Sequence, residues 1–168
     1  MSNKKYTLVI NPGATSTKAA IYEGETEVFT ENLSHPIEEI QKFHEVADQF
    51  EYRKTAILDM VKRHGVSTDE IAVVMGRGGL TRPCESGCYR VNDLMKEECH
   101  AGIQGKHACN LGALISDAIA REIGLECAYI ADPASWTSVR NSPRSADTRC
   151  STSTRAAKAS SGTASTRR

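Results

Sequence analysis

The chain has 168 residues, 39% of them hydrophobic, which is enough for one domain with a sizeable core. Its charge is unevenly distributed along the chain. Residues 1–133 carry 14 basic and 20 acidic side chains, whereas residues 134–168 carry 7 basic side chains and one acidic side chain, Asp147. The acidic body argues against a nucleic-acid-binding domain, since phosphate contacts need clustered cations.

The sequence also argues against a membrane protein. No run approaches the roughly 20 apolar residues of a membrane span, and the N-terminus lacks the apolar core of a signal peptide. We therefore expect a cytoplasmic protein whose six cysteines are reduced thiols. An alternative is a zinc site, although the spacing is not a paired CxxC; its candidate ligands are Cys84, Cys88, Cys99, His100, His107 and Cys109.

The first predicted elements are three short strands. Residues 6–11 form an apolar run typical of a buried strand, residues 18–22 are its expected partner, and residues 27–32 form a third strand. Because the connections are short, we predict an antiparallel meander.

The hydrophobic period then becomes helical. Apolar residues recur at helical spacing from Ile37 to Phe50 and on to Val61, and Gly65 ends the pattern. Residues 71–75, IAVVM, predict a strand that is buried on both faces of a sheet.

After a glycine-rich loop, the remaining elements are a small strand at 89–91, a short helix at 92–98, a helix at 110–123 and a strand at 127–131. The order βββ-α-β-α-β predicts an α/β fold in which helices cover the faces of a mixed sheet. This order resembles the ribonuclease-H-like half-domains of the actin and sugar-kinase superfamily.

The turn between the first two predicted strands is rich in small residues and is followed by the cation Lys18. A hairpin does not need so many small residues, but a phosphate site does, because it requires close backbone approach, inward N–H groups and hydroxyl donors. The alternative is a polar hairpin tip with a solvated lysine. The residues of this turn are Asn11, Gly13, Ala14, Thr15, Ser16 and Thr17.

Three further side chains are candidates for the same site. Arg77 lies in the loop after a buried strand, where ligands of open α/β sheets bind, and its guanidinium fits a phosphoryl group or a carboxylate. Asp132 follows the last strand and could hold Mg²⁺ or orient a nucleophile. His107 precedes a helix and could stabilise a transferring phosphoryl group. The alternatives are a surface arginine, an Asp-Pro turn and a capping histidine.

Several stretches together resemble the acetokinase family and, within it, the butyrate kinases. They occur in the family's order and cover residues 6–133 nearly continuously. The proline in NPGATSTK and the GRGG sequence resemble the butyrate branch. The matching stretches are LVINPGATSTKAAIYEGE, NLSHPIEEIQKF, DQFEYRKTAIL, VVMGRGGLTRP, YRVNDLM, HACNLGALISDAIA and YIADP.

The resemblance implies Mg²⁺-assisted transfer of phosphate from ATP to butyrate, which gives butyryl phosphate and ADP. It implies that Arg77 holds the carboxylate or the transferring phosphoryl, that His107 stabilises this phosphoryl, and that Asp132 orients substrate or metal. The residues implied to contact nucleotide phosphates or metal lie in the first loop; they are Asn11 (also a metal ligand, with Asp132), Gly13, Thr15, Ser16, Thr17 and Lys18.

Alternatives to a butyrate kinase remain open. The substrate could be acetate, propionate or a branched-chain carboxylate, because the acyl pocket is not readable from these residues. A catalytically dead phosphate-binding module is an alternative from a different class. The resemblance also implies a homo-oligomer, with a small carboxylate and a nucleotide as ligands and with neither nucleic acid nor membrane as a partner.

The family pattern ends near residue 133. Residues 134–168 contain 15 Ser and Thr and a single branched aliphatic residue, Val139, a composition that predicts a disordered tail. Read from the third base of each codon, residues 134–138 permit Val-Val-Asp-Glu and residues 142–149 permit Ala-Lys-Ile-Ser-Gly-His-Pro, both of which resemble the family's continuation. We therefore predict an N-terminal domain, residues 1–133, truncated before its last helix and second domain by a reading-frame shift, and little kinase activity.

Overall fold

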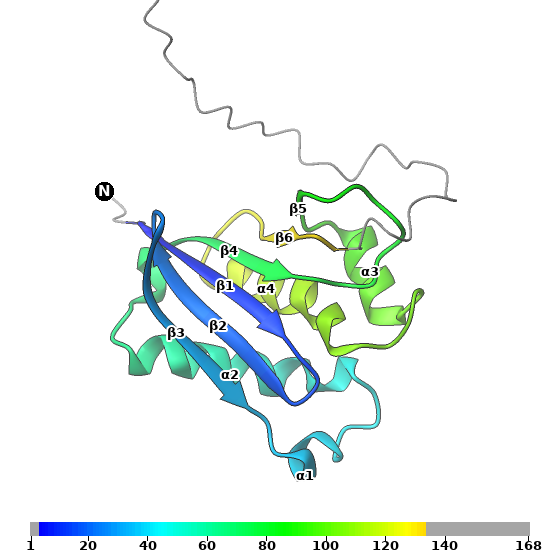
Figure 1. Cartoon of the computed structure of the whole chain (residues 1–168). Coiled ribbons are helices and arrows are strands. Elements are labelled where there is room, and N and C mark those ends of the chain that lie inside the picture. Colours follow the sequence, from blue (N-terminus) through cyan, green and yellow to red (C-terminus); the bar gives the residue numbers. More distant parts are fainter. Residues whose placement is uncertain (1–3, 134–168) are drawn as a thin grey trace, which may run out of the picture.

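The computed structural model describes residues 4–133, which form one mixed six-stranded sheet in the order β3-β2-β1-β4-β6-β5 (Figure 1). The first three strands form the predicted antiparallel meander. They are β1 (Tyr6–Pro12), β2 (Ser16–Glu23) and β3 (Thr26–Ser34).

The other half of the sheet is built by crossover connections. β4 (Ile71–Arg77) pairs parallel to β1, and β6 (Tyr129–Ala131) pairs parallel to β4. β5 (Cys88–Arg90) closes this side of the sheet by pairing antiparallel to β6. A meander that continues through parallel crossovers confirms the α/β, ribonuclease-H-like class predicted from the element order.

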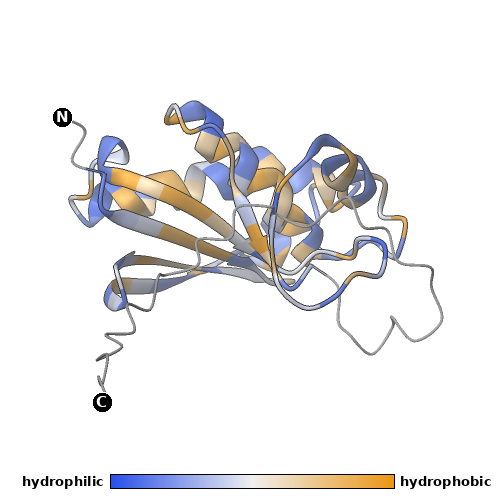
Figure 2. Ribbon diagram, turned by 90° about the horizontal axis from the view of Figure 1, so that it is seen from above, coloured by the Kyte–Doolittle hydropathy of each residue, from blue (hydrophilic) through white to orange (hydrophobic). Residues whose placement is uncertain are grey.

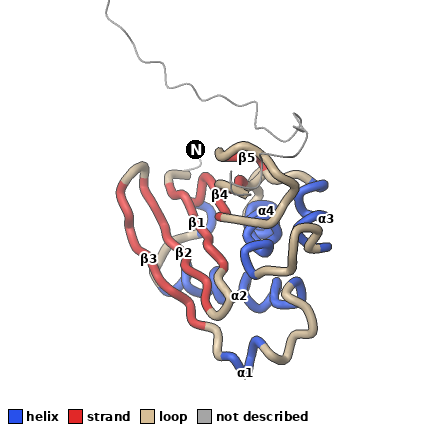
Figure 3. The backbone as a smooth tube through the Cα atoms, turned by 45° about the vertical axis from the view of Figure 1, so that its right-hand side comes forward, coloured by secondary structure: helices blue, strands red, loops and turns tan. Residues whose placement is uncertain are grey.

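The two longest helices cover one face of this sheet. α2 (Phe50–Arg63) buries Ile57, Met60 and Val61, and α4 (Leu111–Glu122) buries Ile115 and Ile119 against the strands. Figure 2 shows hydrophobic residues where the helical layer meets the sheet, and Figure 3 shows the same division between helices and strands. The remaining helical segments are α1 (Ile37–Ile40), η1 (Ala47–Gln49), η2 (Thr68–Glu70), α3 (Asp93–Ala101) and η3 (Ala108–Asn110).

The structure differs from the predicted helix between residues 37 and 65. α1 has only four residues, and a bent segment separates it from η1 and α2. In this segment the carboxylate of Asp48 accepts a hydrogen bond from the backbone N–H of Glu45 at 2.9 Å, a local bond that competes with helix continuation. The periodic residues Val46 and Phe50 are partly buried against the core, whereas Ile37, at the start of the pattern, is 56% exposed. The pattern therefore indicated burial correctly only for its later residues, and it indicated a continuous helix wrongly.

β4 is also less enclosed than predicted. Ile71 and Val74 are fully buried, whereas Val73 and Met75 remain partly accessible. Figures 2 and 3 show α2 and α4 on one side of the sheet. Within residues 4–133, these two long helices therefore cover only one face of β4.

The predicted tail, residues 134–168, and the boundary placed before it lie outside the described residues. Within residues 4–133, no helix is both long and apolar enough to cross a bilayer.

Candidate functional site

The parallel strands β1, β4 and β6 bring three chain segments to one edge of the sheet. Ile10 pairs with Gly76, and Arg77 pairs with Ala131, so these strands end side by side. The turn after β1, Arg77 at the end of β4 and Asp132 after β6 therefore share the carboxyl edge, which is the usual ligand edge of open α/β sheets (Figure 1).

The small-residue turn between β1 and β2 is tight and exposed. The N–H of Gly13 donates to the carbonyl of Ser16 at 2.7 Å, while Ala14 and Thr15 form the exposed tip. Lys18 is exposed on β2 opposite the half-buried Asn11.

A fully buried arginine of α2, which was not among the candidates predicted from the sequence, holds this turn from the interior of the protein. The Arg53 guanidinium donates to the carbonyls of Gly13 at 2.8 Å, Ala14 at 2.9 Å and Ser16 at 3.2 Å. It also donates twice to Oε1 of Gln49, at 3.1 and 2.8 Å. The sequence does contain a signal for the burial of Arg53. This residue lies four residues before Ile57 and therefore on the apolar face of its helix.

The hydroxyl of Thr17 belongs to the same buried network. It accepts a hydrogen bond from Nη1 of Arg53 at 3.1 Å and lies 2.9 Å from Nε2 of His35. A hydroxyl proton directed at Nε2 of His35 corresponds to the neutral Nδ1–H tautomer of this histidine. Burial, followed by the charge of Arg53, lowers the pKa of His35 to about 4. Thr17, predicted to contact phosphate, thus has its hydroxyl engaged inside the protein.

Arg77 stands exposed at the end of β4, where helix α4 approaches the strand closely. A Cβ on Gly76 would lie 2.5 Å from the carbonyl oxygen of Gly112, and a Cβ on Gly112 would lie 2.8 Å from that of Arg77. Both glycines are therefore needed for the backbone of α4 to rest on the last residues of β4.

Buried Asn110 ties the glycine-rich loop after Arg77 to the segment that carries His107. Its Oδ1 accepts from the N–H of Leu80 at 2.8 Å, and its Nδ2 donates to the carbonyl of Gly105 at 2.9 Å. From the sequence, Asn110 was predicted only as the start of a helix. Its two bonds bring the loops that follow β4 and α3 together.

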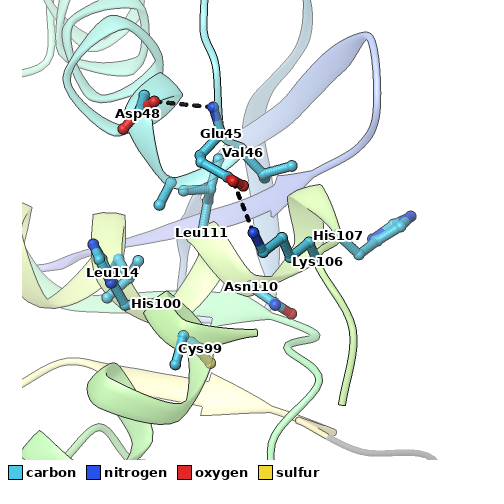
Figure 4. Close-up of a pocket in the computed structure, with 12 residues that line it drawn as sticks. Glu45, Val46, Asp48, Cys99, His100, Lys106, His107, Asn110, Leu111 and Leu114 are labelled. Atoms are coloured by element: carbon cyan, nitrogen blue, oxygen red, sulfur yellow. Dashed lines mark hydrogen bonds and ion pairs between the residues drawn. The ribbon is translucent and has the colours of Figure 1, made fainter. Parts of the chain in front are cut away.

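The structure shows that His107 caps a short helix. Nδ1 of its ring accepts a hydrogen bond from the N–H of Cys109 at 3.2 Å, at the start of η3. This nitrogen therefore has the capping role that was the alternative to a catalytic one. When the ring is neutral, the proton is then on Nε2, which remains free to donate. Figure 4 shows the exposed imidazole pointing away from the neighbouring side chains.

Next to His107 lies a cavity of about 300 Å³ between residues 45–48, at the start of η1, and helices α3 and α4 (Figure 4). An ion pair between Lys106 and Glu45, 2.8 Å apart, borders it. The cavity contains no part of the turn after β1 and neither Arg77 nor Asp132.

Asp132 is held in a defined orientation at the carboxyl edge. It adopts a positive φ of 47°, and its Oδ1 accepts from Oγ of Ser86 at 2.5 Å and from the N–H of Gly87 at 3.0 Å. The Ser86 bond, then the Gly87 bond and the charge of Arg77 hold the pKa of this carboxyl below its usual range. The carboxylate is therefore ionised at neutral pH.

The donors on this edge fit Mg²⁺ better than Zn²⁺. Mg²⁺ prefers oxygen ligands and commonly uses one or two carboxylates with substrate phosphates and water, a role that ionised Asp132 and the amide of Asn11 suit. Residues 4–133 contain no group of three or more His, Cys, Asp or Glu side chains arranged to hold a metal. The six candidate zinc ligands thus do not form such a cluster.

Fold and site together define an α/β protein that gathers cationic and carboxylate side chains, with a turn of small residues, at one sheet edge. Over 126 residues the chain is 48% identical to Butyrate kinase 1 of Clostridium acetobutylicum, and over 126 residues it is 44% identical to Butyrate kinase 2 of the same organism. Each match covers 75% of this chain and 35% of the relative. The resemblance to butyrate kinases is therefore confirmed, and the chain spans about a third of the length of the curated relatives it matches.

Other comparisons are more distant. No protein-family model matches the chain. An exopolyphosphatase structure from Cytophaga hutchinsonii aligns with a TM-score of 0.48 and 9% identity, over 76% of this chain and 53% of that one. The PPX-GPPA enzyme of Aquifex aeolicus aligns with a TM-score of 0.42 and 11% identity, over 78% and 55% of the two chains.

Proposed function

We propose that the described residues belong to the phosphate-handling part of a butyrate kinase, which transfers the terminal phosphoryl group of ATP to butyrate and forms butyryl phosphate and ADP. The observation that carries this proposal is the 48% identity to a butyrate kinase, which extends over most of the described chain. A cytoplasmic location and a homo-oligomeric enzyme are further expectations from the same resemblance.

The arrangement at the sheet edge supports this chemistry. Phosphoryl transfer depends mainly on positioning and on neutralising negative charge. In the proposal, the turn around Gly13, Thr15 and Ser16 faces the nucleotide phosphates, and Lys18 adds a positive charge. Arg77 holds the carboxylate of butyrate or the transferring phosphoryl group by two parallel N–H bonds.

The remaining site residues have complementary proposed roles. Nε2–H of His107 donates to the transferring phosphoryl group, and Asp132 offers its ionised carboxylate to orient substrate or metal. Mg²⁺, when bound near Asp132 and Asn11, would neutralise phosphate charge. Thr17 acts from inside by shaping the turn, because its hydroxyl is bonded to Arg53 and His35.

A second candidate is a phosphate-binding module without turnover. This candidate predicts binding of Mg²⁺-ATP or butyrate at the same sheet edge without formation of butyryl phosphate.

The test combines an activity assay with a binding assay. Butyryl phosphate is trapped with hydroxylamine, while ligand-induced shifts of the backbone amide signals of residues 13–18 and 77–79 report binding. Replacement of Arg77 by lysine should weaken butyrate or ATP binding about tenfold or more, since lysine cannot make the paired contact. Arg63→Lys, in an exposed ion pair with Glu31, is the matched control.

The outcomes separate the two candidates. Trapped butyryl phosphate supports the kinase. Binding that depends on Arg77, without product, supports the binding module. If neither ATP nor butyrate shifts the signals of these residues, both proposals are wrong.

A further inference from the structure

Arg53 is a fully buried cation without a paired carboxylate among the described residues. Its side chain has no accessible surface, and all its hydrogen-bond acceptors are neutral oxygens, from Gln49, Thr17 and three turn carbonyls. No ion pair within residues 4–133 includes it. Burial of an unpaired charge is costly, so such a residue calls for a reason beyond packing.

The bonds to Arg53 also determine which way the turn presents its amides. The C=O and N–H groups of one trans peptide point in opposite directions, and residues 4–133 contain no cis peptide bond. Because the carbonyls of Gly13 and Ala14 point inward to Arg53, the N–H groups of Ala14 and Thr15 must point outward. These two residues are exposed, and their amides donate to no acceptor in the described part of the chain.

The result is a pair of outward N–H groups directly above a buried positive charge. Successive N–H groups that converge in a turn form an anion-binding concavity, and a cation in a low-dielectric interior is screened less than one at the surface. Lys18, by contrast, is exposed to solvent.

We propose that Arg53 is a positioning residue whose buried, uncompensated charge also strengthens anion binding at the 13–16 turn. Its hydrogen bonds turn the amides of Ala14 and Thr15 outward, and its charge attracts the phosphate groups that these amides meet. This inference rests on the proposed function, because it assumes that the turn faces phosphate.

Gln49 offers a way to separate the charge of Arg53 from its hydrogen bonds. Gln49→Glu has nearly the same shape, keeps an oxygen where Arg53 donates twice, and adds a negative charge that compensates the cation. The turn should keep its conformation, whereas the affinity for inorganic pyrophosphate should fall about fivefold or more. Gln41→Glu, the same change at an exposed position, is the matched control and should leave affinity nearly unchanged.

The measurement is a pyrophosphate titration of the chain, followed by calorimetry and by the amide signals of Ala14 and Thr15. Selective weakening in Gln49→Glu, with those signals in their original positions before pyrophosphate is added, supports the charge role. Equal affinity of Gln49→Glu and the unsubstituted chain overturns the charge role and leaves the proposed function standing. No binding by the unsubstituted chain overturns the anion site itself and this inference with it.

A second variant decides the question if Gln49→Glu does not fold. Arg53→Lys keeps a cation but cannot bond all the oxygens that the guanidinium holds. Weakened but measurable pyrophosphate binding by a folded Arg53→Lys chain supports a contribution from charge. Complete loss of binding in a folded chain assigns the effect to the hydrogen bonds alone and overturns the charge role.

Discussion

At the scale of single residues, a chain of hydrogen bonds links the surface turn to the interior. Arg53 donates to the hydroxyl of Thr17, which lies 2.9 Å from Nε2 of His35. The ring of His35 also meets the edge of Tyr52 at a centroid distance of 5.2 Å. Burial and the charge of Arg53 favour an uncharged His35, because protonation would place a second cation in the interior beside Arg53.

The protonation of His35 should therefore control stability in mild acid. Its pKa is about 4 in the folded protein against an ordinary value of 6.5, so the unfolded chain binds more protons between these pH values. The contribution to the free energy of unfolding is full above pH 6.5 and is lost as the pH falls toward 4, by at most about 3 kcal/mol. Urea unfolding at a series of pH values measures this loss.

The matched variant for this prediction is His35→Gln. The glutamine oxygen can accept from Thr17 near the position of Nε2 but does not titrate in this range. The difference in unfolding free energy between the two chains should shrink as the pH falls from 6.5 to 4. A constant difference over that range would show that His35 does not carry the effect.

At the scale of elements, the contact of α4 with β4 sets the geometry of the carboxyl edge. Gly76 and Gly112 allow backbone to meet backbone, and Arg77 is the next residue of the strand. Just before the first residue of α4, Asn110 links the loop after β4 to the loop after α3 through its two side-chain hydrogen bonds. The position of Arg77 relative to His107 therefore depends on how closely the helix rests on the strand.

A Gly112→Ala substitution tests this contact with two opposing expectations. Helix propensity alone predicts stabilisation by about 1 kcal/mol. The added Cβ would lie 2.8 Å from the carbonyl oxygen of Arg77, which is backbone and cannot move aside cheaply. We therefore expect destabilisation by about 1–3 kcal/mol.

Thermal and urea unfolding measure the outcome, and amide shifts of residues 76–79 report whether the strand end moves. Unchanged or increased stability would mean that α4 can shift away from β4 without cost. In that case the close contact would not be what positions Arg77.

At the scale of the whole molecule, an acidic body of 133 residues is followed by a basic, Ser- and Thr-rich segment. The match to butyrate kinases covers 75% of the chain, and the shifted codons of residues 134–138 and 142–149 permit two segments that resemble the continuation of the same family. We propose that a reading-frame shift near residue 133 accounts for both features.

The DNA that encodes the chain tests this explanation directly. We expect that one inserted or deleted base near codon 133 restores an open frame that encodes Val-Val-Asp-Glu and a further domain. Sequencing through this region, from an independent template, is the measurement. Immediate stop codons in the shifted frame would show that the explanation is wrong.

The sequence by itself determined the order of the elements and the edge at which the candidate site lies. Strand periods, short turns and the two crossover helices leave few topologies, and parallel strands must end at the same edge. Asn11, Arg77 and Asp132 could thus be placed near that edge without coordinates. The roles of these residues remain predictions.

Only the tertiary structure decided what lies beneath the site. A helical pattern shows that Arg53 shares a face with Ile57, but not that turn carbonyls 37 to 40 residues away provide its acceptors. The same holds for the inward hydroxyl of Thr17, the capping nitrogen of His107 and the break after α1. Each depends on which buried polar groups meet across the fold, and the requirement that such groups be hydrogen-bonded selects the partners only after the layers have packed.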